Sequence, residues 1–147
     1  MLVLRRAVLG WGLSAIVAMP GVAFAQTALL LFGGQGHKTF LGCVNCSKYD
    51  SGSICNRYGP SGSKYQSDSI WNVYGSFGSQ YSSQSPWNKY ATDPPAVVDK
   101  DGRFYGYFTA NQFNAKRTQI KFLVALSDAS DEVVRDIDAA QDSVCES

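Results

Sequence analysis

Residues 47–90 read SKYDSG (47–52), SICNRYGPSGSKYQSD (53–68), SIWNVYGSFGSQYSSQ (69–84) and SPWNKY (85–90). Aligned in this way, the segments repeat serine, asparagine, tyrosine and glycine every 16 residues. The aligned sets are Ser53, Ser69 and Ser85; Asn56, Asn72 and Asn88; Tyr58, Tyr74 and Tyr90; Tyr49, Tyr65 and Tyr81; Gly59 and Gly75; Gly62 and Gly78. A fixed period indicates an array in which each unit buries its apolar side chains against its neighbours.

Each unit begins with serine, has asparagine three residues later and ends in Tyr-Gly. Serine is a favoured N-cap, asparagine can complete a capping box, and glycine ends a helix in the left-handed conformation. Pro86 suits a first helical position and would break a central strand. The pattern therefore predicts a helix of one to two turns per unit over residues 47–90. A disordered tract is the alternative, and the fixed spacing argues against it.

Residues 1–25 have the features of an export signal. Two arginines precede an uncharged apolar run over residues 7–22, and AFA at residues 23–25 supplies the small residues of a cleavage site. A retained membrane anchor is the alternative, but glycine and proline interrupt the run and it is short for a spanning helix. We predict cleavage after residue 25, which leaves residues 26–147 as a single mature domain.

The mature chain is close to electrically neutral. Cleavage removes two of the 13 basic residues and none of the 12 acidic residues, so 11 basic residues remain. Such a chain has no basic field for nucleic acid or anionic lipid. We therefore expect a secreted or periplasmic protein with no nucleic-acid partner and no membrane association after signal removal.

All four cysteines lie in the mature chain, at Cys43, Cys46, Cys55 and Cys145. An even number of cysteines in an oxidising compartment predicts two disulfides, and three pairings are possible. A bridge from Cys145 to the N-terminal group would close a loop of about 90 to 100 residues and contribute about 4 to 5 kcal/mol. In the repeat register, Cys55 occupies the position of the tryptophans, and Cys43 and Cys46 occupy the positions of the two glycines. The thiols are therefore predicted to staple the N-terminal end of the array.

Two further segments have strand patterns. The apolar run over residues 28–32 ends at glycine and predicts a short buried strand. Residues 96–109 contain an Asp-Gly turn between β-branched and aromatic residues, which is typical of a β-hairpin. Strand alternation places Phe104 and Phe108 on one face of this hairpin.

The C-terminal part has helical patterns. Residues 120–126 fit either a strand or the end of a helix. Ser130 as a cap, an acidic first turn and one apolar face predict a C-terminal helix over residues 130–142. Together the patterns predict a small α+β domain held by two disulfides, with a 16-residue repeat array of short helical turns, one β-hairpin and a C-terminal helix.

No arrangement of residues predicts catalysis. His37 is the only histidine, and the HExxH and GxSxG patterns are absent. We therefore expect a non-enzymatic protein without a cofactor. One alternative is a zinc site formed by His37, Cys43, Cys46 and Cys55, and another is a redox pair in the CxxC sequence. In an exported chain, disulfide pairing is favoured over both.

Aromatic side chains in the array are the candidates for ligand binding. Trp71, Trp87 and Tyr74 can form a platform for sugar rings, and the alternative is that the tryptophans belong to the core. We expect an exported structural or binding module whose partner is an envelope component or a glycan.

Three groups of motifs resemble a known family: FLGCVNC (40–46), the units SICNRYG, SIWNVYG and SPWNKY, and DKDGRFYGYFTAN (99–111). In these, the chain is similar to uncharacterised small secreted bacterial proteins, over about half of the precursor. The resemblance implies a bacterial envelope or secreted protein, and it carries over no activity, catalytic residue or cofactor. The first unit departs from the second by lacking the aromatic Phe77.

Overall fold

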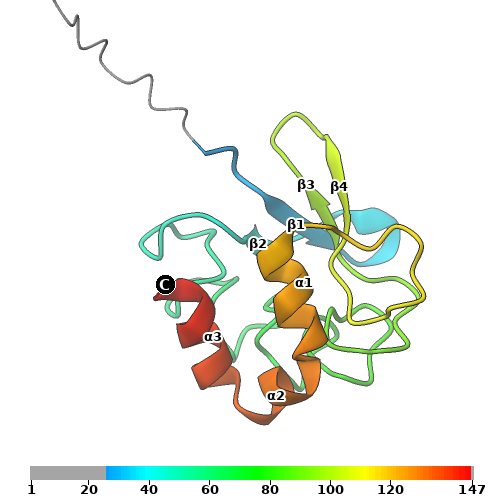
Figure 1. Cartoon of the computed structure of the whole chain (residues 1–147). Helices are drawn as coiled ribbons and strands as arrows, with labels where there is room; N and C mark the ends of the chain where they lie inside the picture. Colours follow the sequence, from blue (N-terminus) through cyan, green and yellow to red (C-terminus); the bar gives the residue numbers. More distant parts are fainter. Residues whose placement is uncertain (1–25, 147) are drawn as a thin grey trace, which may run out of the picture.

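The computed structural model describes residues 26–146 (Figure 1). The predicted export signal lies outside the described residues. The described strands are β1 (Leu30–Gly33), β2 (Thr39–Cys43), β3 (Ala96–Val98) and β4 (Phe104–Tyr107), and the helices are the 3-10 turn η1 (Gln35–His37), α1 (Lys121–Asp128), α2 (Ser130–Arg135) and α3 (Ile137–Cys145). None of the helices in this part of the chain is long and apolar enough to cross a membrane. The predicted α+β class is confirmed.

The four strands form one antiparallel sheet in the order β2-β1-β3-β4. The predicted first strand is β1, which lies in the middle of the sheet and pairs Leu31 with Val97 of β3. Both side chains are fully buried. Because β2 and β3 flank the repeat region in the chain, the array leaves the sheet on one side of β1 and returns on the other.

The predicted hairpin forms from β3 and β4, but the prediction that Phe104 and Phe108 share a face is wrong. Tyr105 and Gly106 of β4 lie opposite the single residue Val97 of β3, and Gly106 has a φ of 93°. Such a bulge changes which residues face the core. Phe108 is consequently fully buried whereas Phe104 is 45% exposed, so the two rings do not share a face.

Asp99 organises the turn between β3 and β4. Its carboxylate accepts the backbone N–H groups of Asp101 and Arg103 and the hydroxyl of Tyr105, each at 2.9 Å. These bonds, above all the one from Arg103, hold the pKa of Asp99 below its ordinary value because they stabilise the ionised form.

Removing the Asp99 charge is expected to weaken the acid sensitivity of the fold. A folded-state pKa below the unfolded value contributes stability above the unfolded pKa, and this contribution is lost as the pH falls below about 4 through the folded pKa. The Asp99→Asn variant should therefore lose less stability than the wild type between about pH 7 and about pH 3. Urea unfolding at both pH values measures this difference, and parallel losses in the two proteins would contradict it.

The C-terminal helical region is divided. The prediction of one helix over residues 130–142 is wrong because the chain leaves the helical conformation at Asp136, where φ is −142° and ψ is 83°. The Asp136 carboxylate then accepts a backbone N–H of the first turn of α3 at 3.0 Å. Ser130 begins α2 but its hydroxyl does not cap it, and the N-cap position belongs to Ala129. The ambiguous segment at residues 120–126 forms the first part of helix α1.

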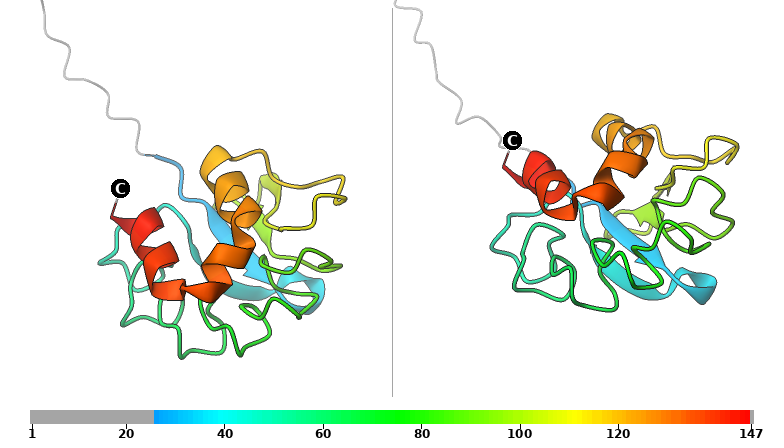
Figure 2. Two further views of the ribbon diagram at one scale, coloured as in Figure 1. Left: turned by 60° about the horizontal axis from the view of Figure 1, so that its bottom comes forward. Right: turned by 90° about the horizontal axis from the view of Figure 1, so that it is seen from below.

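Residues 47–90 form a continuous series of turns, so the prediction of short helices is wrong (Figure 2). In most turns a backbone N–H donates to the carbonyl three residues earlier, and the last residue of one turn is the first residue of the next. Each unit has five turns. Four of them advance the chain by three residues, and the one that begins at the glycine corner advances it by four, so the bonds recur at an interval of 16 residues. The corners of the second unit are Ser69, Asn72, Gly75, Ser79 and Ser82.

The corner side chains explain why the chain does not continue as a helix. The oxygen of Ser69 accepts the N–H of Trp71 at 3.2 Å, and the oxygen of Asn72 accepts the N–H of Tyr74 at 3.1 Å. The Asn72 amide also donates to the carbonyl of Gln66 at 3.1 Å. The equivalent asparagines of the other two units make the same two bonds. Serine and asparagine oxygens therefore bind backbone amides locally at the serine and asparagine corners, which favours turns over a helix.

Replacing Asn72 with alanine should lower the free energy of unfolding by about 2 kcal/mol, because two hydrogen bonds of about 1 kcal/mol each are lost. The matched control is Asn72→Asp, which keeps the oxygen acceptor and loses the amide donor. Its expected loss is about 1 kcal/mol. Urea unfolding measures both, and equal losses in the two variants would show that the donor and the acceptor do not act separately.

The glycines of the array act through their size and not through left-handed backbone. Gly59 and Gly75 were the predicted left-handed positions, but the described glycines with positive φ are others: Gly34, Gly36, Gly42, Gly102 and Gly106. A Cβ at Gly62 would lie 2.0 Å from the carbonyl oxygen of the preceding asparagine corner, and at Gly78 the distance would be 2.1 Å. Only glycine therefore fits where each unit folds back on its own asparagine.

A ladder of aromatic rings joins the units. The indole N–H of Trp71 donates to the carbonyl of Ile54 at 2.7 Å, and that of Trp87 donates to Ile70 at 2.6 Å. The two indole rings are stacked with centroids 5.8 Å apart, and Phe108 meets Trp87 edge-on at 5.3 Å. Both tryptophans and both isoleucines belong to the core. Each tryptophan thus satisfies its polar group and packs against the preceding unit.

Helices α2 and α3 lie along one side of the array (Figure 2). The buried amide of Gln141 on α3 donates to the carbonyls of Ile54 at 2.8 Å and Gly62 at 2.7 Å, both in the first unit. The ammonium of Lys89 in the last unit pairs with Asp131 of α2 at 2.6 Å. The two helices therefore contact opposite ends of the array.

Two disulfides form, as predicted, and the structure selects one of the three possible pairings. Cys55 of the first unit pairs with Cys145, the last residue of α3, across a separation of 90 residues. Cys43, the last residue of β2, pairs with Cys46 in the loop that follows, across a separation of three residues. Two disulfides are expected of a protein from an oxidising compartment, such as the periplasm or the extracellular space.

Candidate functional site

Six tyrosines of the array project into solvent. Their exposed fractions lie between 80% and 102%. They are Tyr49, Tyr58, Tyr65, Tyr74, Tyr81 and Tyr90. Burying an aromatic side chain contributes favourable free energy, and a folded chain normally takes this gain where it can. Six such rings left in water at equivalent positions form the most conspicuous surface feature of the array.

The corner geometry directs these rings outward. Each of these tyrosines follows a serine or asparagine corner by two residues, and the corner oxygen accepts the tyrosine N–H. The serine set comprises Tyr49, Tyr65 and Tyr81, and the asparagine set comprises Tyr58, Tyr74 and Tyr90. These bonds fix the backbone of each tyrosine. The rings therefore start from regularly spaced backbone positions, and this spacing does not depend on bonds made by the tyrosine hydroxyl groups.

The two sets differ in what covers their faces. The ammonium of Lys48 lies 5.6 Å from the ring centre of Tyr49, and that of Lys64 lies 5.6 Å from Tyr65. Lys64 also donates to Asp138 of α3 at 2.7 Å, which raises the pKa of Lys64 and lowers that of Asp138. In the part of the chain that the structure describes, no cation lies over a ring of the asparagine set. Among the described residues, a lysine therefore lies over two of the three rings of the serine set, Tyr81 being the exception, and over none of the asparagine set.

The predicted sugar platform needs correction at the tryptophans. Trp71 is fully buried and Trp87 is 2% exposed, so their rings are core and cannot receive a ligand. Tyr74 is 96% exposed and remains a candidate. Both residue types are aromatic and recur at fixed positions of the repeat, but the tryptophan follows a serine corner that faces the core whereas the tyrosine follows a corner that faces water.

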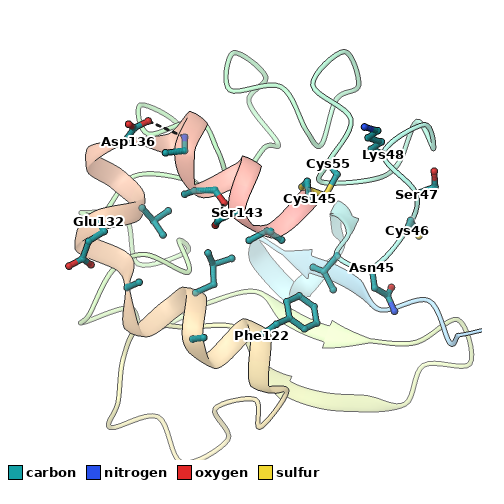
Figure 3. Close-up of a pocket in the computed structure, with 18 of the residues that line it drawn as sticks. Asn45, Cys46, Ser47, Lys48, Cys55, Phe122, Glu132, Asp136, Ser143 and Cys145 are labelled. Atoms are coloured by element: carbon teal, nitrogen blue, oxygen red, sulfur yellow. Dashed lines mark hydrogen bonds between the residues drawn. A yellow bond between two sulfur atoms is a disulfide. The ribbon is translucent and has the colours of Figure 1, made fainter. Parts of the chain in front are cut away.

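A second candidate is a pocket of about 1080 Å³ framed by α1, α2, α3 and the loop after β2 (Figure 3). Its walls include the apolar side chains of Val44, Phe122, Leu126 and Val133. Polar side chains stand around them, among which Figure 3 labels Asn45, Lys48, Glu132, Asp136 and Ser143. Sequence reasoning missed this pocket because it depends on where three separate helices come to lie.

Both disulfides reach this pocket. Cys46, Cys55 and Cys145 are among its lining residues, whereas Cys43 is 2% exposed and is not. The sequence placed Cys43, Cys46 and Cys55 near the start of the array, and the structure agrees. Three of the four disulfide-bonded cysteines therefore line a pocket shared with the helical region.

The zinc alternative is not assembled. The Nε2 atom of His37 lies 3.0 Å from the carbonyl oxygen of Pro94 and 3.4 Å from the Asp93 carboxylate, while the cysteines pair with one another. Within residues 26–146, no group of three or more His, Cys, Asp and Glu side chains could hold a metal ion. The structure therefore does not bring His37, Cys43, Cys46 and Cys55 together as a ligand set.

The turn geometry continues beyond the repeat, which the sequence analysis missed. Asn111 and Asn114 act as further corners, because each accepts an N–H two residues later. The first corner also donates its amide to the carbonyl of Ala91 at 2.9 Å, next to the last unit. Phe113 occupies the place of a tyrosine and is 92% exposed. The signal was the spacing of asparagines in NQFN, without the serine that marks the other units.

The chain was compared with protein families, with curated proteins and with solved structures. No family model matches it, and no curated protein or solved structure shows significant similarity to it.

Proposed function

We propose that the mature chain is an exported, non-enzymatic binding module of the bacterial envelope, and that its asparagine set of tyrosines binds a glycan. The observation that carries this proposal is the exposure of Tyr58, Tyr74 and Tyr90, at 102%, 96% and 80%. The predicted secretory signal, the two disulfides and the resemblance to small secreted bacterial proteins support the proposed location.

The chemistry of the rings favours a glycan over other partners. Tyrosine combines an apolar face with a hydroxyl, so it suits ligands that have both apolar faces and hydroxyl groups, as sugar rings do. The near-neutral mature chain has no basic field for nucleic acid or anionic lipid. A polymer of similar sugars also suits a protein surface whose binding side chains recur at a fixed interval.

The turns pre-organise this surface. The N–H groups of Tyr58, Tyr74 and Tyr90 are held by asparagine corners at 2.9–3.1 Å. Binding therefore requires little ordering of the backbone, and the entropic cost falls mainly on the tyrosine side chains. A rigid repeated surface can collect several weak stacking contacts into one useful affinity.

The experiment is binding of the mature protein to insoluble peptidoglycan and to soluble glycan fragments. The triple variant Tyr58→Ala, Tyr74→Ala, Tyr90→Ala should bind about 100-fold more weakly, because three ring contacts of about 1 kcal/mol each are lost. Co-sedimentation and calorimetry measure the affinity. Buried tryptophans are poor reporters, so fluorescence is not the primary readout.

Two control variants make the test specific. Replacing the three tyrosines of the serine set with alanine removes the same number of exposed rings and should change the affinity for the glycan by less than about threefold. Replacing the three tyrosines of the asparagine set with phenylalanine keeps the aromatic rings and should retain most of the binding. Equal losses from both alanine triples would remove the assignment to the asparagine set, and absence of wild-type binding across the glycans would refute the proposal.

A further inference from the structure

The two disulfides have unequal structural importance. Cys55–Cys145 ties the first unit to the end of α3 across 90 residues, whereas Cys43–Cys46 joins residues only three apart. In the chain-entropy account, closing such a short loop restricts the unfolded chain far less than closing a long one. Stabilisation of the fold is therefore a weaker explanation for Cys43–Cys46 than for Cys55–Cys145.

Hydrogen bonds hold the Cys43–Cys46 loop without its disulfide. The backbone N–H of Cys43 donates to the carbonyl of Gly52 at 2.8 Å, and its carbonyl accepts the N–H of Ile54 at 3.0 Å. The Asn45 side chain accepts the N–H of Leu29 at 2.8 Å and donates to a carbonyl at the start of the described chain. None of these bonds involves a sulfur atom, so opening the disulfide removes none of them directly.

The two sulfurs differ in access. Cys43 is 2% exposed, whereas Cys46 is partly exposed and lines the pocket between the loop and the helices. The Cys43 sulfur lies 3.4 Å from the side-chain oxygen of Asn45. A disulfide sulfur has no proton to donate, so this contact becomes an S–H···O hydrogen bond only after reduction. The site thus has an accessible sulfur and a buried sulfur with an acceptor ready for its thiol.

We propose that Cys43–Cys46 is an exchange-competent disulfide that reacts with thiols reaching Cys46 through the pocket. An incoming thiolate attacks the Cys46 sulfur and forms a new S–S bond, while the Cys43–Cys46 bond breaks. The Cys43 sulfur leaves with the electron pair and takes a proton from water. A second thiolate of the same substrate then attacks the mixed disulfide, which leaves Cys46 as a thiolate. The substrate dithiol is thereby oxidised to a disulfide and the Cys43–Cys46 pair is reduced by two electrons.

The first test uses the full mature chain in millimolar reduced glutathione, followed by alkylation and peptide mass mapping. Cys43 and Cys46 should become alkylated in most molecules, with Cys55–Cys145 still closed and the circular dichroism unchanged. Structural disulfides resist the glutathione pool, so this selectivity separates the two roles. The proposal would be overturned if both disulfides opened together or if Cys55–Cys145 opened first. It would also be overturned if neither disulfide opened while the protein remained folded.

The second test uses the access difference between the two sulfurs. With oxidised glutathione, Cys43→Ser should form a mixed disulfide at Cys46 at least about tenfold faster than Cys46→Ser does at the buried Cys43. Equal or reversed rates would overturn the proposal. A disulfide-bonded peptide with apolar residues beside its cysteine distinguishes the thiol source: a rate well above that of glutathione identifies polypeptide thiols, and similar rates identify small thiols. Glycan binding by the same variants should be unchanged, so the two proposals can fail separately.

Discussion

Replacing both Cys55 and Cys145 with serine should lower the free energy of unfolding by about 4 to 5 kcal/mol. The pair closes a loop with a sequence separation of 90 residues, and its removal frees the unfolded chain from that constraint. Small domains are typically stable by about 5 to 15 kcal/mol, so the loss can leave most molecules unfolded at 37 °C. Denaturation by urea, followed by circular dichroism, measures the effect.

The matched control is the double replacement Cys43→Ser, Cys46→Ser. The same relation gives about 2 kcal/mol for a loop this short, and the hydrogen bonds around Cys43 persist. If the two double variants lost equal stability, the separation of a structural disulfide from an exchange-competent one would be wrong. The comparison is independent of any ligand.

Replacing Gly78 with alanine should destabilise the fold by about 3 kcal/mol or more. A Cβ at this position would lie 2.1 Å from the carbonyl oxygen of Asn72 and 2.8 Å from that of Ile70. Both contacts are with backbone atoms, so they cannot be relieved by rotating a side chain. The second unit must therefore open, which disturbs the stacking of its own Trp71 against Trp87 of the next unit.

Gly75 in the same unit provides the control for this prediction. The nearest atoms to a Cβ there belong to the Asn72 side chain, at 3.2 and 3.3 Å, and the backbone φ is not in the left-handed region. The Gly75→Ala variant should therefore stay within about 1 kcal/mol of the wild type. Thermal and urea unfolding compare the two variants. A loss at Gly75 as large as that at Gly78 would show that conformational freedom, and not close backbone approach, is what glycine supplies.

The candidate site could be predicted from the sequence only in part. The register identified the tyrosines at Tyr58, Tyr74 and Tyr90 as equivalent, and the structure makes them equivalently exposed. It could not separate them from Trp71 and Trp87, because aromatic residues at fixed spacing suit a core as well as a surface. Which corners of a unit face the core depends on where the sheet and α1–α3 pack, and no single unit carries that information.

The turns show why local sequence rules selected the wrong element. Serine and asparagine oxygens bind amides at a helix N-terminus and also at the first position of a turn, so one residue pattern fits both. A helix then requires the next carbonyls to be bonded four residues on. With a corner at Ser69 and another at Asn72, the side chains bind the intervening amides, and the chain turns again instead.

The sequence by itself determined the first buried strand, the antiparallel hairpin, the helical C-terminus and the presence of two disulfides. These depend on hydrophobicity, on turn chemistry and on an even number of cysteines in a chain with a predicted export signal. Only the tertiary structure decided the order of the four strands, the break at Asp136, the partner of each cysteine and the pocket among the helices. The reason is physical: these features arise where segments far apart in the chain, such as Cys55 and Cys145, come into contact, and such contacts depend on the packing of the whole domain.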